Sequence, residues 1–266
     1  MNVRDVEADL IAEQSSLDTI IAELSDDEWS RPTPSPGWSV ADQIGHLTYF
    51  DGTAATAITD PERFAQLADE LLAATGSDTA GDDLTLSAYR SMSPTELVRV
   101  WRRNRAVLAD AAARLADDDR VVWYGPSMGS KSFLTARLME VWAHGQDICD
   151  ALDLDHPRTD RIRHIAQLGF ITHNWTYVNR QLPPPTTPVF VQLNAPSGDV
   201  WNFGSGDANN SIKGPAVDFC MVVTQRRHVD DTELEVKGRA ARDWMEKAQA
   251  FAGPPTDGPP PGRSTT

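Results

Sequence analysis

From residue 3 to about residue 180 the apolar residues of this chain recur every three to four positions, until a run of prolines at 183–185. Leu10, Leu17 and Leu24 open the pattern at a seven-residue spacing, which places them on one face of a helix. Several amphipathic helices joined by short connections favour an antiparallel bundle. Because proline cannot continue a helix, the run predicts the end of the helical region and a stiff hinge.

Start and stop signals divide this region into helices. Ser39 with Asp42 three residues later resembles a capping pair, and Ser93 followed by Pro94 predicts another helix start. The segment 75–92 offers room for a longer crossover, with 76–83 expected as a loop. The predicted helices run from residue 3 to a stop at 31–37, and over 39–59, 60–74, 93–115, 130–152 and 160–178.

The composition changes after the prolines. Residues 189–193 and 200–203 predict strands around a turn at 195–199, and 216–224 and 240–251 predict helices. The expected fold class is therefore mainly α with an α+β C-terminal part. The predicted domains are a helical domain over 1–182, a small α+β domain over 189–252, and a flexible Pro/Gly-rich tail over 253–266.

Charge and composition narrow the function classes. The formal net charge is −15, which disfavours nucleic acid and acidic membrane surfaces as partners. No apolar run approaches the roughly 18 residues of a membrane helix, and the start of the chain lacks the pattern of a secretion signal. Cys149 and Cys220 are too few for a secreted disulfide framework, and we expect buried, reduced thiols. The expected location is the cytoplasm.

Three side chains are candidate metal ligands. Glu140 and His144 are four residues apart on one predicted helix, so both project from the same side and can reach one ion. His46 lies on a distant predicted helix, beside its apolar stripe. Zinc and similar divalent ions accept imidazole nitrogen and carboxylate oxygen, and a catalytic site usually has three protein ligands and one open position.

The spacing by itself leaves other interpretations open. Glu and His four residues apart are common on solvated helices, where they form surface pairs. A single helix histidine such as His46 is more often satisfied within the fold than bound to a metal. His164 and His173, on another predicted helix, are second-choice ligands.

Two stretches carry paired motifs, PGWSVADQIGHL at residues 36–47 and RLMEVWAHGQD at residues 137–147. The first contains Gly-Trp-x-x-x-Asp-x-x-x-His and the second Glu-x-x-x-His-x-x-Asp. Together they resemble the mycothiol-dependent maleylpyruvate isomerase family. The ending at 248–255 looks like an actinobacterial metal-binding subgroup of that family rather than the isomerase proper.

The resemblance implies a fold and a ligand set. The family's metal-binding domain is a DinB-like four-helix bundle, often followed by a small α/β domain of sterol-carrier-protein type, which residues 189–252 could form. Its ligand positions correspond to His46, Glu140 and His144 here. A divalent metal, with zinc most expected, and mycothiol as a thiol cosubstrate are therefore implied.

The implied chemistry is isomerisation of a small, possibly anionic substrate, or transfer to it, by a metal-activated low-molecular-weight thiol. Four further residues are candidates for the catalytic site. Asp147 is a candidate acceptor that orients a metal ligand, and Arg137, Arg226 and Arg227 are candidate contacts for an anionic substrate. Solvated surface charges explain Asp147 and Arg137 more simply, and the preference for positive charge near a helix C-terminus explains Arg226 and Arg227 at least as simply.

Two other functions remain open at this stage. One is a metal-assisted hydrolase that uses metal-bound water, and the other is a non-catalytic metal-binding module. The sequence is compatible with a monomer and with a homodimer.

Overall fold

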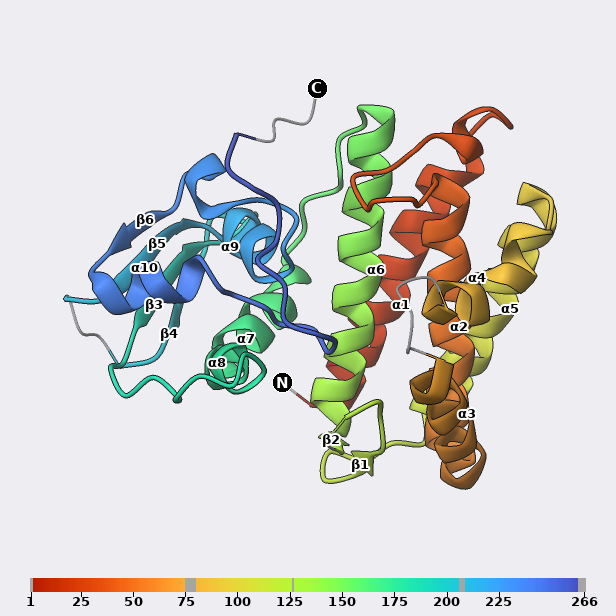
Figure 1. The fold of residues 1–266 in the computed structure, drawn as a ribbon, viewed down its shortest axis with the longest axis horizontal. Coiled ribbons are helices and arrows are strands. Elements are labelled where there is room, and N and C mark those ends of the chain that lie inside the picture. Colours follow the sequence, from red (N-terminus) through yellow and green to blue (C-terminus); the bar gives the residue numbers. More distant parts are fainter. Residues whose placement is uncertain (1, 75–79, 126, 206–208, 263–266) are drawn as a thin grey trace. The chain divides into compact units, whose positions relative to one another are not determined.

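The computed structural model describes residues 2–74, 80–125, 127–205 and 209–262 (Figure 1). The chain divides into two compact units, Met1–His156 and Pro157–Thr266, and each is one continuous stretch. The chain is mainly helical with a small sheet in its C-terminal part, which confirms the coarse fold class. Within the described ranges, no helix is both long and apolar enough to span a membrane.

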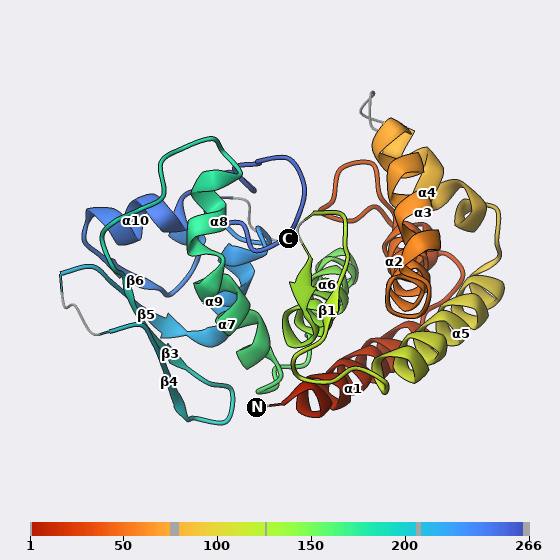
Figure 2. The same cartoon turned by 90° about the horizontal axis from the view of Figure 1, so that it is seen from below.

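The first unit is built on four long helices. In Figures 1 and 2, α2 lies alongside α5 and α6, and α1 lies alongside α6 and α5, while α3 and α4 pack on α2. Its elements are α1 (Val3–Ala22), a 3-10 turn (Glu28–Ser30), α2 (Val40–Thr59), α3 (Pro61–Ala74), α4 (Ala80–Arg90), α5 (Pro94–Ala112), β1 (Arg120–Val121), β2 (Met128–Gly129) and α6 (Ser130–Leu152). The antiparallel strands β1 and β2 form a short hairpin that leads into α6.

The predicted helix starts are present as caps. The Ser39 hydroxyl accepts a hydrogen bond from the Asp42 main-chain N–H, and the Asp42 carboxylate accepts one from the Ser39 N–H. The Ser93 hydroxyl caps α5 by accepting a hydrogen bond from the Glu96 main-chain N–H, and Pro94 is the first residue of the helix. Asp42 also forms an ion pair with Arg90 of α4, with 2.7 Å between Nε and Oδ1. The start of α2 is therefore fixed both locally and by a second helix.

Part of the loop expected over 76–83 is a helix. Residues 76–79 lie outside the described ranges, but α4 begins at Ala80. Leu86 on this helix has no exposed surface, and it packs where Gly45 of α2 has no side chain. An added Cβ at Gly45 would lie 3.1 Å from the Tyr89 Cβ and 3.4 Å from Leu86. Burial of this apolar face against α2 explains why the crossover is helical.

The second unit combines helices with a four-stranded sheet. The strand order is β4-β3-β5-β6, with β3 parallel to β5 and the other neighbours antiparallel. One sheet face buries Val191, Leu193, Trp201, Phe203 and Ile212. The elements are α7 (Ile162–Ile171), α8 (His173–Val178), β3 (Phe190–Asn194), β4 (Val200–Phe203), β5 (Ser211–Pro215), α9 (Ala216–Val223), a 3-10 turn (Val229–Asp231), β6 (Glu235–Lys237) and α10 (Arg239–Met245).

The structure differs from the sequence-based boundaries in this unit. The helix expected over 160–178 is interrupted at Thr172, whose hydroxyl donates to main-chain carbonyls of α7. Strands β5 and β6 were not predicted, because each is short and only one or two of its residues are apolar. The helix α10 ends at Met245 rather than near 251.

Along the chain, the boundary between the two compact units lies between His156 and Pro157, not at the proline run. Helices α7 and α8 were expected in the helical domain over 1–182, but α7 packs against α9 and belongs to the second unit. Gly169 of α7 makes this packing close, because an added Cβ would lie 2.8 Å from a methyl group of Val223. The apolar face of α7 is thus buried within the second unit.

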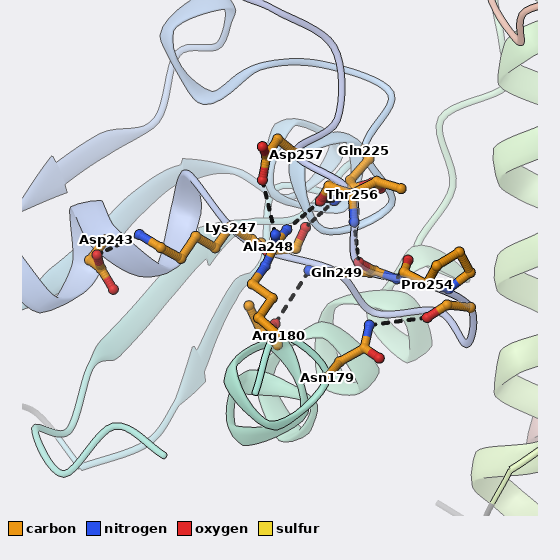
Figure 3. A network of polar contacts seen from close by, with 12 residues as sticks. Asn179, Arg180, Gln225, Asp243, Lys247, Ala248, Gln249, Pro254, Thr256 and Asp257 are labelled. Atoms are coloured by element: carbon orange, nitrogen blue, oxygen red, sulfur yellow. Dashed lines mark hydrogen bonds and ion pairs between the residues drawn. The ribbon is translucent and has the colours of Figure 1, made fainter. Parts of the chain in front are cut away.

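The described part of the C-terminal tail is bonded to the second unit (Figure 3). Asn179 donates to the Gly253 carbonyl, and Arg180 forms an ion pair with Asp257 and donates to the Thr256 carbonyl. Gln249 donates to the Pro254 carbonyl and accepts from the Thr256 N–H. Main-chain carbonyls and polar side chains thus join residues 253–257 to the second unit, and the mobility expected from the low apolar content of the tail stays a prediction.

Candidate metal centre

Three donor atoms from two helices converge in the first unit. The Nε2 atom of His46, on α2, lies 3.1 Å from Oε2 of Glu140, on α6. The Nε2 atom of His144, one turn further along α6, lies 3.2 Å from the same oxygen. Among the described residues, these three form the group of His, Cys, Asp and Glu side chains able to hold a metal ion, with one donor atom of each within 4.8 Å of the others.

Packing of α2 against α6 produces this arrangement. Glu140 and His144 share one face of α6 because they are four residues apart, and α2 packs on α6 and carries His46. The side chains of His46, Glu140 and His144 are 16%, 24% and 9% exposed. The donors are therefore largely shielded, with the carboxylate the most accessible to solvent.

The spacing of the donors fits a divalent cation. Ligand atoms bound at about 2.0–2.2 Å at the corners of a tetrahedron lie roughly 3.3–3.6 Å apart. The contacts of 3.1 and 3.2 Å from Glu140 to the histidines are close to that spacing. Two imidazole nitrogens and one carboxylate oxygen are also the ligand types that zinc and similar ions accept.

Burial and mutual contacts change how the donors titrate. Burial and the neighbouring charge of His144 lower the pKa of His46 to about 4, although Glu140 opposes this shift. For the Glu140 carboxyl, burial raises the pKa, but the polar contacts with His144 and His46 outweigh it and hold the pKa well below its usual range. A neutral imidazole beside a carboxylate is the protonation state that metal binding requires.

Aromatic rings flank the two imidazoles. Trp38 lies 5.1 Å from the His46 ring and 5.9 Å from the His144 ring, measured between ring centroids. Phe50, one turn after His46 on α2, has its centroid 4.5 Å from the His46 ring. These rings limit the rotation of the histidines and keep water from their faces.

The second nitrogen of His144 has a partner that we did not predict from the sequence. Nδ1 of His144 lies 2.5 Å from Oε1 of Gln43, a residue of α2 with no exposed surface. Asp147, expected as the orienting acceptor, lies further away, with Oδ2 at 3.9 Å from Nδ1. The sequence feature that could have indicated Gln43 is its spacing, because it lies three residues before His46 and therefore on the same face of α2.

Arg137 takes part in a buried network of hydrogen bonds to Asp51. Its Nη2 donates to Oδ1 of Asp51 at 2.9 Å, and the two side chains are 3% and 0% exposed. Gln14 and Trp101 donate to the other oxygen of Asp51, at 3.1 and 3.3 Å. We expected Arg137 to contact an anionic substrate, whereas its guanidinium forms an ion pair with the internal carboxylate of Asp51.

The other residues proposed from the sequence lie in the second unit. His164 and His173, the second-choice ligands, are on α7 and α8, and the donor group of the described residues contains neither. Arg226 and Arg227 follow α9, and a guanidinium nitrogen of each donates to a main-chain carbonyl. Their expected contact with a substrate stays a prediction.

Residues 10–149 match the family described as the mycothiol maleylpyruvate isomerase N-terminal domain, which is more than half of the chain. The chain belongs to this family. The resemblance noted from the two motifs is thereby confirmed. The match to the maleylpyruvate isomerase family spans α2 and nearly all of α6, and it includes the positions of His46, Glu140 and His144.

Relatives of this family member include two uncharacterized proteins, one from each of two strains of Mycobacterium tuberculosis. Each is 44% identical over 253 residues, which covers 94% of this chain and 96% of the relative. The similarity therefore extends over both compact units.

Solved structures extend the family likeness to the fold. Two crystal structures of the mycothiol-dependent maleylpyruvate isomerase, one of them of a mutant, match with TM-scores of 0.56 and 0.55. Sequence identity is 16% and 14%, and each match covers 85% of this chain and 90% of the other. At this identity the likeness shows a shared fold and nothing about the reaction.

Proposed function

We propose that this chain is a divalent-metal-dependent enzyme that uses a low-molecular-weight thiol, mycothiol by family membership, to isomerise a small substrate or transfer a group to the thiol. The observation that carries the proposal is the convergence of His46 Nε2, Glu140 Oε2 and His144 Nε2 from α2 and α6. Zinc is the proposed ion, because its ligand preferences match this donor set.

The residues of the site have distinct proposed roles. His46 and His144 supply neutral nitrogen donors, and Glu140 supplies a negative charge that compensates the cation. A divalent cation bound there would favour the thiolate form of a nearby thiol. Trp38 and Phe50 restrict water around the donors. Three protein ligands leave room for one further ligand, which a catalytic site requires.

The finer assignment of the fold is part of the proposal. We propose that α1, α2, α5 and α6 form a DinB-like bundle and that the sheet of the second unit belongs to a domain of sterol-carrier-protein type. The pairwise packing of the four long helices supports the first assignment. The mixed sheet order β4-β3-β5-β6 with helices α7 and α9 supports the second.

Metal analysis of the purified protein tests the ligand set. The wild type should hold about one divalent ion per chain, and His46→Ala should lower that content at least ~10-fold because one of three ligands is lost. The control is His228→Ala, which removes a largely buried histidine outside the donor group. A full complement of metal in His46→Ala would remove His46 from the site.

Thiol binding tests the proposed chemistry. The cobalt-substituted protein is titrated with mycothiol and, as a control, with S-methylated mycothiol. A thiolate-to-cobalt absorption band with mycothiol alone, together with thiol-dependent turnover of maleylpyruvate or of an electrophilic acceptor, would support the proposal. Thiol-independent ester hydrolysis would favour the hydrolase, and a fully protein-ligated ion needed for folding would favour the non-catalytic module.

A further inference from the structure

We propose that Gln43 is a positioning residue for His144, and that Thr33 fixes the orientation of Gln43. Together they hold His144 as the tautomer with hydrogen on Nδ1, so that the lone pair of Nε2 faces the other two donors. This inference rests on the proposed function in that it describes the same metal site. It concerns side chains of this chain alone, and it can be tested in the metal-free protein.

A chain of hydrogen bonds with a fixed direction supports this assignment. The Thr33 hydroxyl donates to the Trp38 main-chain carbonyl at 2.9 Å, and the Gln43 Nε2 donates to the Thr33 oxygen at 2.8 Å. The Gln43 amide oxygen then faces Nδ1 of His144 at 2.5 Å. A carbonyl can only accept, so the direction of the chain is set at Trp38 and continues to the imidazole.

The opposite orientation of the Gln43 amide would lose a hydrogen bond. With the amide oxygen toward Thr33, the single hydroxyl proton would face two acceptors, Trp38 and Gln43, and could serve only one. Gln43 has no exposed surface, so bulk water does not replace the lost partner. The orientation with the amide oxygen toward His144 satisfies all three bonds.

The charges around Nδ1 favour the same tautomer. Asp147 places a carboxylate oxygen 3.9 Å from Nδ1, and Ser35 donates to that carboxylate at 3.2 Å. A negative charge on this side favours hydrogen on Nδ1 over Nε2. Gln43 accepts the hydrogen bond from Nδ1, and the more distant Asp147 carboxylate adds a favourable negative potential.

This tautomer has a consequence for Glu140. With hydrogen on Nδ1, the Nε2 lone pair of His144 faces the Glu140 oxygen at 3.2 Å, and neither atom can donate to the other. Two acceptors at this separation repel each other unless a cation lies between them. The bond from Gln43 therefore prepares His144 to bind a metal ion rather than to form an ordinary hydrogen bond with Glu140.

The first measurement is the tautomer of His144 in the full-length metal-free protein, read from long-range 1H–15N correlation spectra of histidine-labelled samples. We expect hydrogen on Nδ1 in the wild type and a shift toward hydrogen on Nε2 in Gln43→Leu. Hydrogen on Nε2 in the wild type would overturn the proposal. This readout involves neither thiol nor substrate, so it can succeed where the proposed catalytic function fails.

The second measurement is zinc affinity, from competition with a chelator. Gln43→Leu should bind zinc about 10–100-fold more weakly, Thr33→Val should show a smaller loss, and Thr33→Ser should restore the wild-type value. The control is Thr56→Val, which removes a half-buried hydroxyl of α2 that bonds to Gly52. Unchanged affinity in a folded Gln43→Leu would overturn the proposal. If Gln43→Leu does not fold, the comparison of Thr33→Val with Thr33→Ser decides. Equal zinc affinity of these two variants would then overturn the proposal.

Discussion

At Asp51 a carboxylate without exposed surface accepts hydrogen bonds from three side chains that come from three other helices. Burial raises the pKa of the Asp51 carboxyl, and the Arg137 ion pair opposes that rise. The pair therefore contributes mainly by compensating a charge that would otherwise be buried alone.

Arg137→Met should lower the free energy of unfolding by about 3–5 kcal/mol, because Asp51 would keep a buried charge without its cation. The double variant Asp51→Leu/Arg137→Met should cost less than the sum of the two single variants, since neither charge is left uncompensated. Urea denaturation of all four proteins measures this cycle. Additive costs would show that the two side chains do not depend on each other.

His173 should make the second unit sensitive to acid. Burial lowers its pKa from 6.5 to about 4, so the unfolded chain binds this proton more tightly than the folded one. The associated stability is present above pH 6.5 and is lost as the pH falls through about 4. Allowing for partial exposure, the loss is about 1–2 kcal/mol.

His173→Phe should reduce this acid-dependent loss, because phenylalanine preserves the contact with Trp244, 4.2 Å away between centroids, and does not titrate. The measurement is the free energy of unfolding at several pH values from about 7 to about 4. Identical pH profiles for the two proteins would contradict the prediction.

The three candidate donors could be selected from the sequence, but the side chains around them could not. Glu140 and His144 follow from helical spacing, His46 from its place beside the apolar stripe of another helix, and the family motifs support all three. Gln43 and Asp51 gave no comparable signal, because a glutamine or an aspartate inside an amphipathic helix is ordinary until its partners on other helices are known. Interactions between residues far apart in the chain decide the roles of these side chains.

At the scale of elements, the strand β6 passes into α10 through Gly238, whose φ is +87° and ψ is 156°. This backbone conformation is almost restricted to glycine. An added Cβ would also lie 2.1 Å from the Asn209 carbonyl oxygen. The junction therefore requires glycine for two separate reasons, conformation and space.

Gly238→Ala should lower the free energy of unfolding by more than about 3 kcal/mol, because backbone strain and the collision add. Gly198→Ala is the matched control, since its φ is +94° and nothing lies within 4 Å of an added Cβ. It should cost about 1–2 kcal/mol from strain alone. Thermal unfolding of both variants measures the difference, and equal costs would show that the Asn209 contact relaxes freely.

Helices with strong caps were predicted well, and elements defined by distant contacts were not. Ser39 and Ser93 locate the starts of α2 and α5 because a cap is a local interaction. The helix α4 and the strand β5 depend instead on partners in α2 and β3, which the local sequence does not reveal. The interruption at Thr172 likewise has no proline or glycine to signal it.

At the scale of the whole molecule, all three donors and the bonds from Gln43 and Thr33 lie within Met1–His156. A fragment of residues 1–156 should therefore fold as a helical protein and bind about one zinc ion. Circular dichroism and metal analysis of the fragment, beside the full chain, test this expectation. A fragment that is helical but binds no zinc would show that the donor set needs the second unit.

The chain passes between the two units once, at His156 and Pro157. In the gene, each unit is therefore an uninterrupted block of codons, and one recombination event at this boundary exchanges the whole C-terminal block. The three donor positions would be inherited unchanged through such an exchange. A lineage could thus acquire a new C-terminal partner for the same ion-binding half in a single genetic step, without passing through forms that lack the ligands.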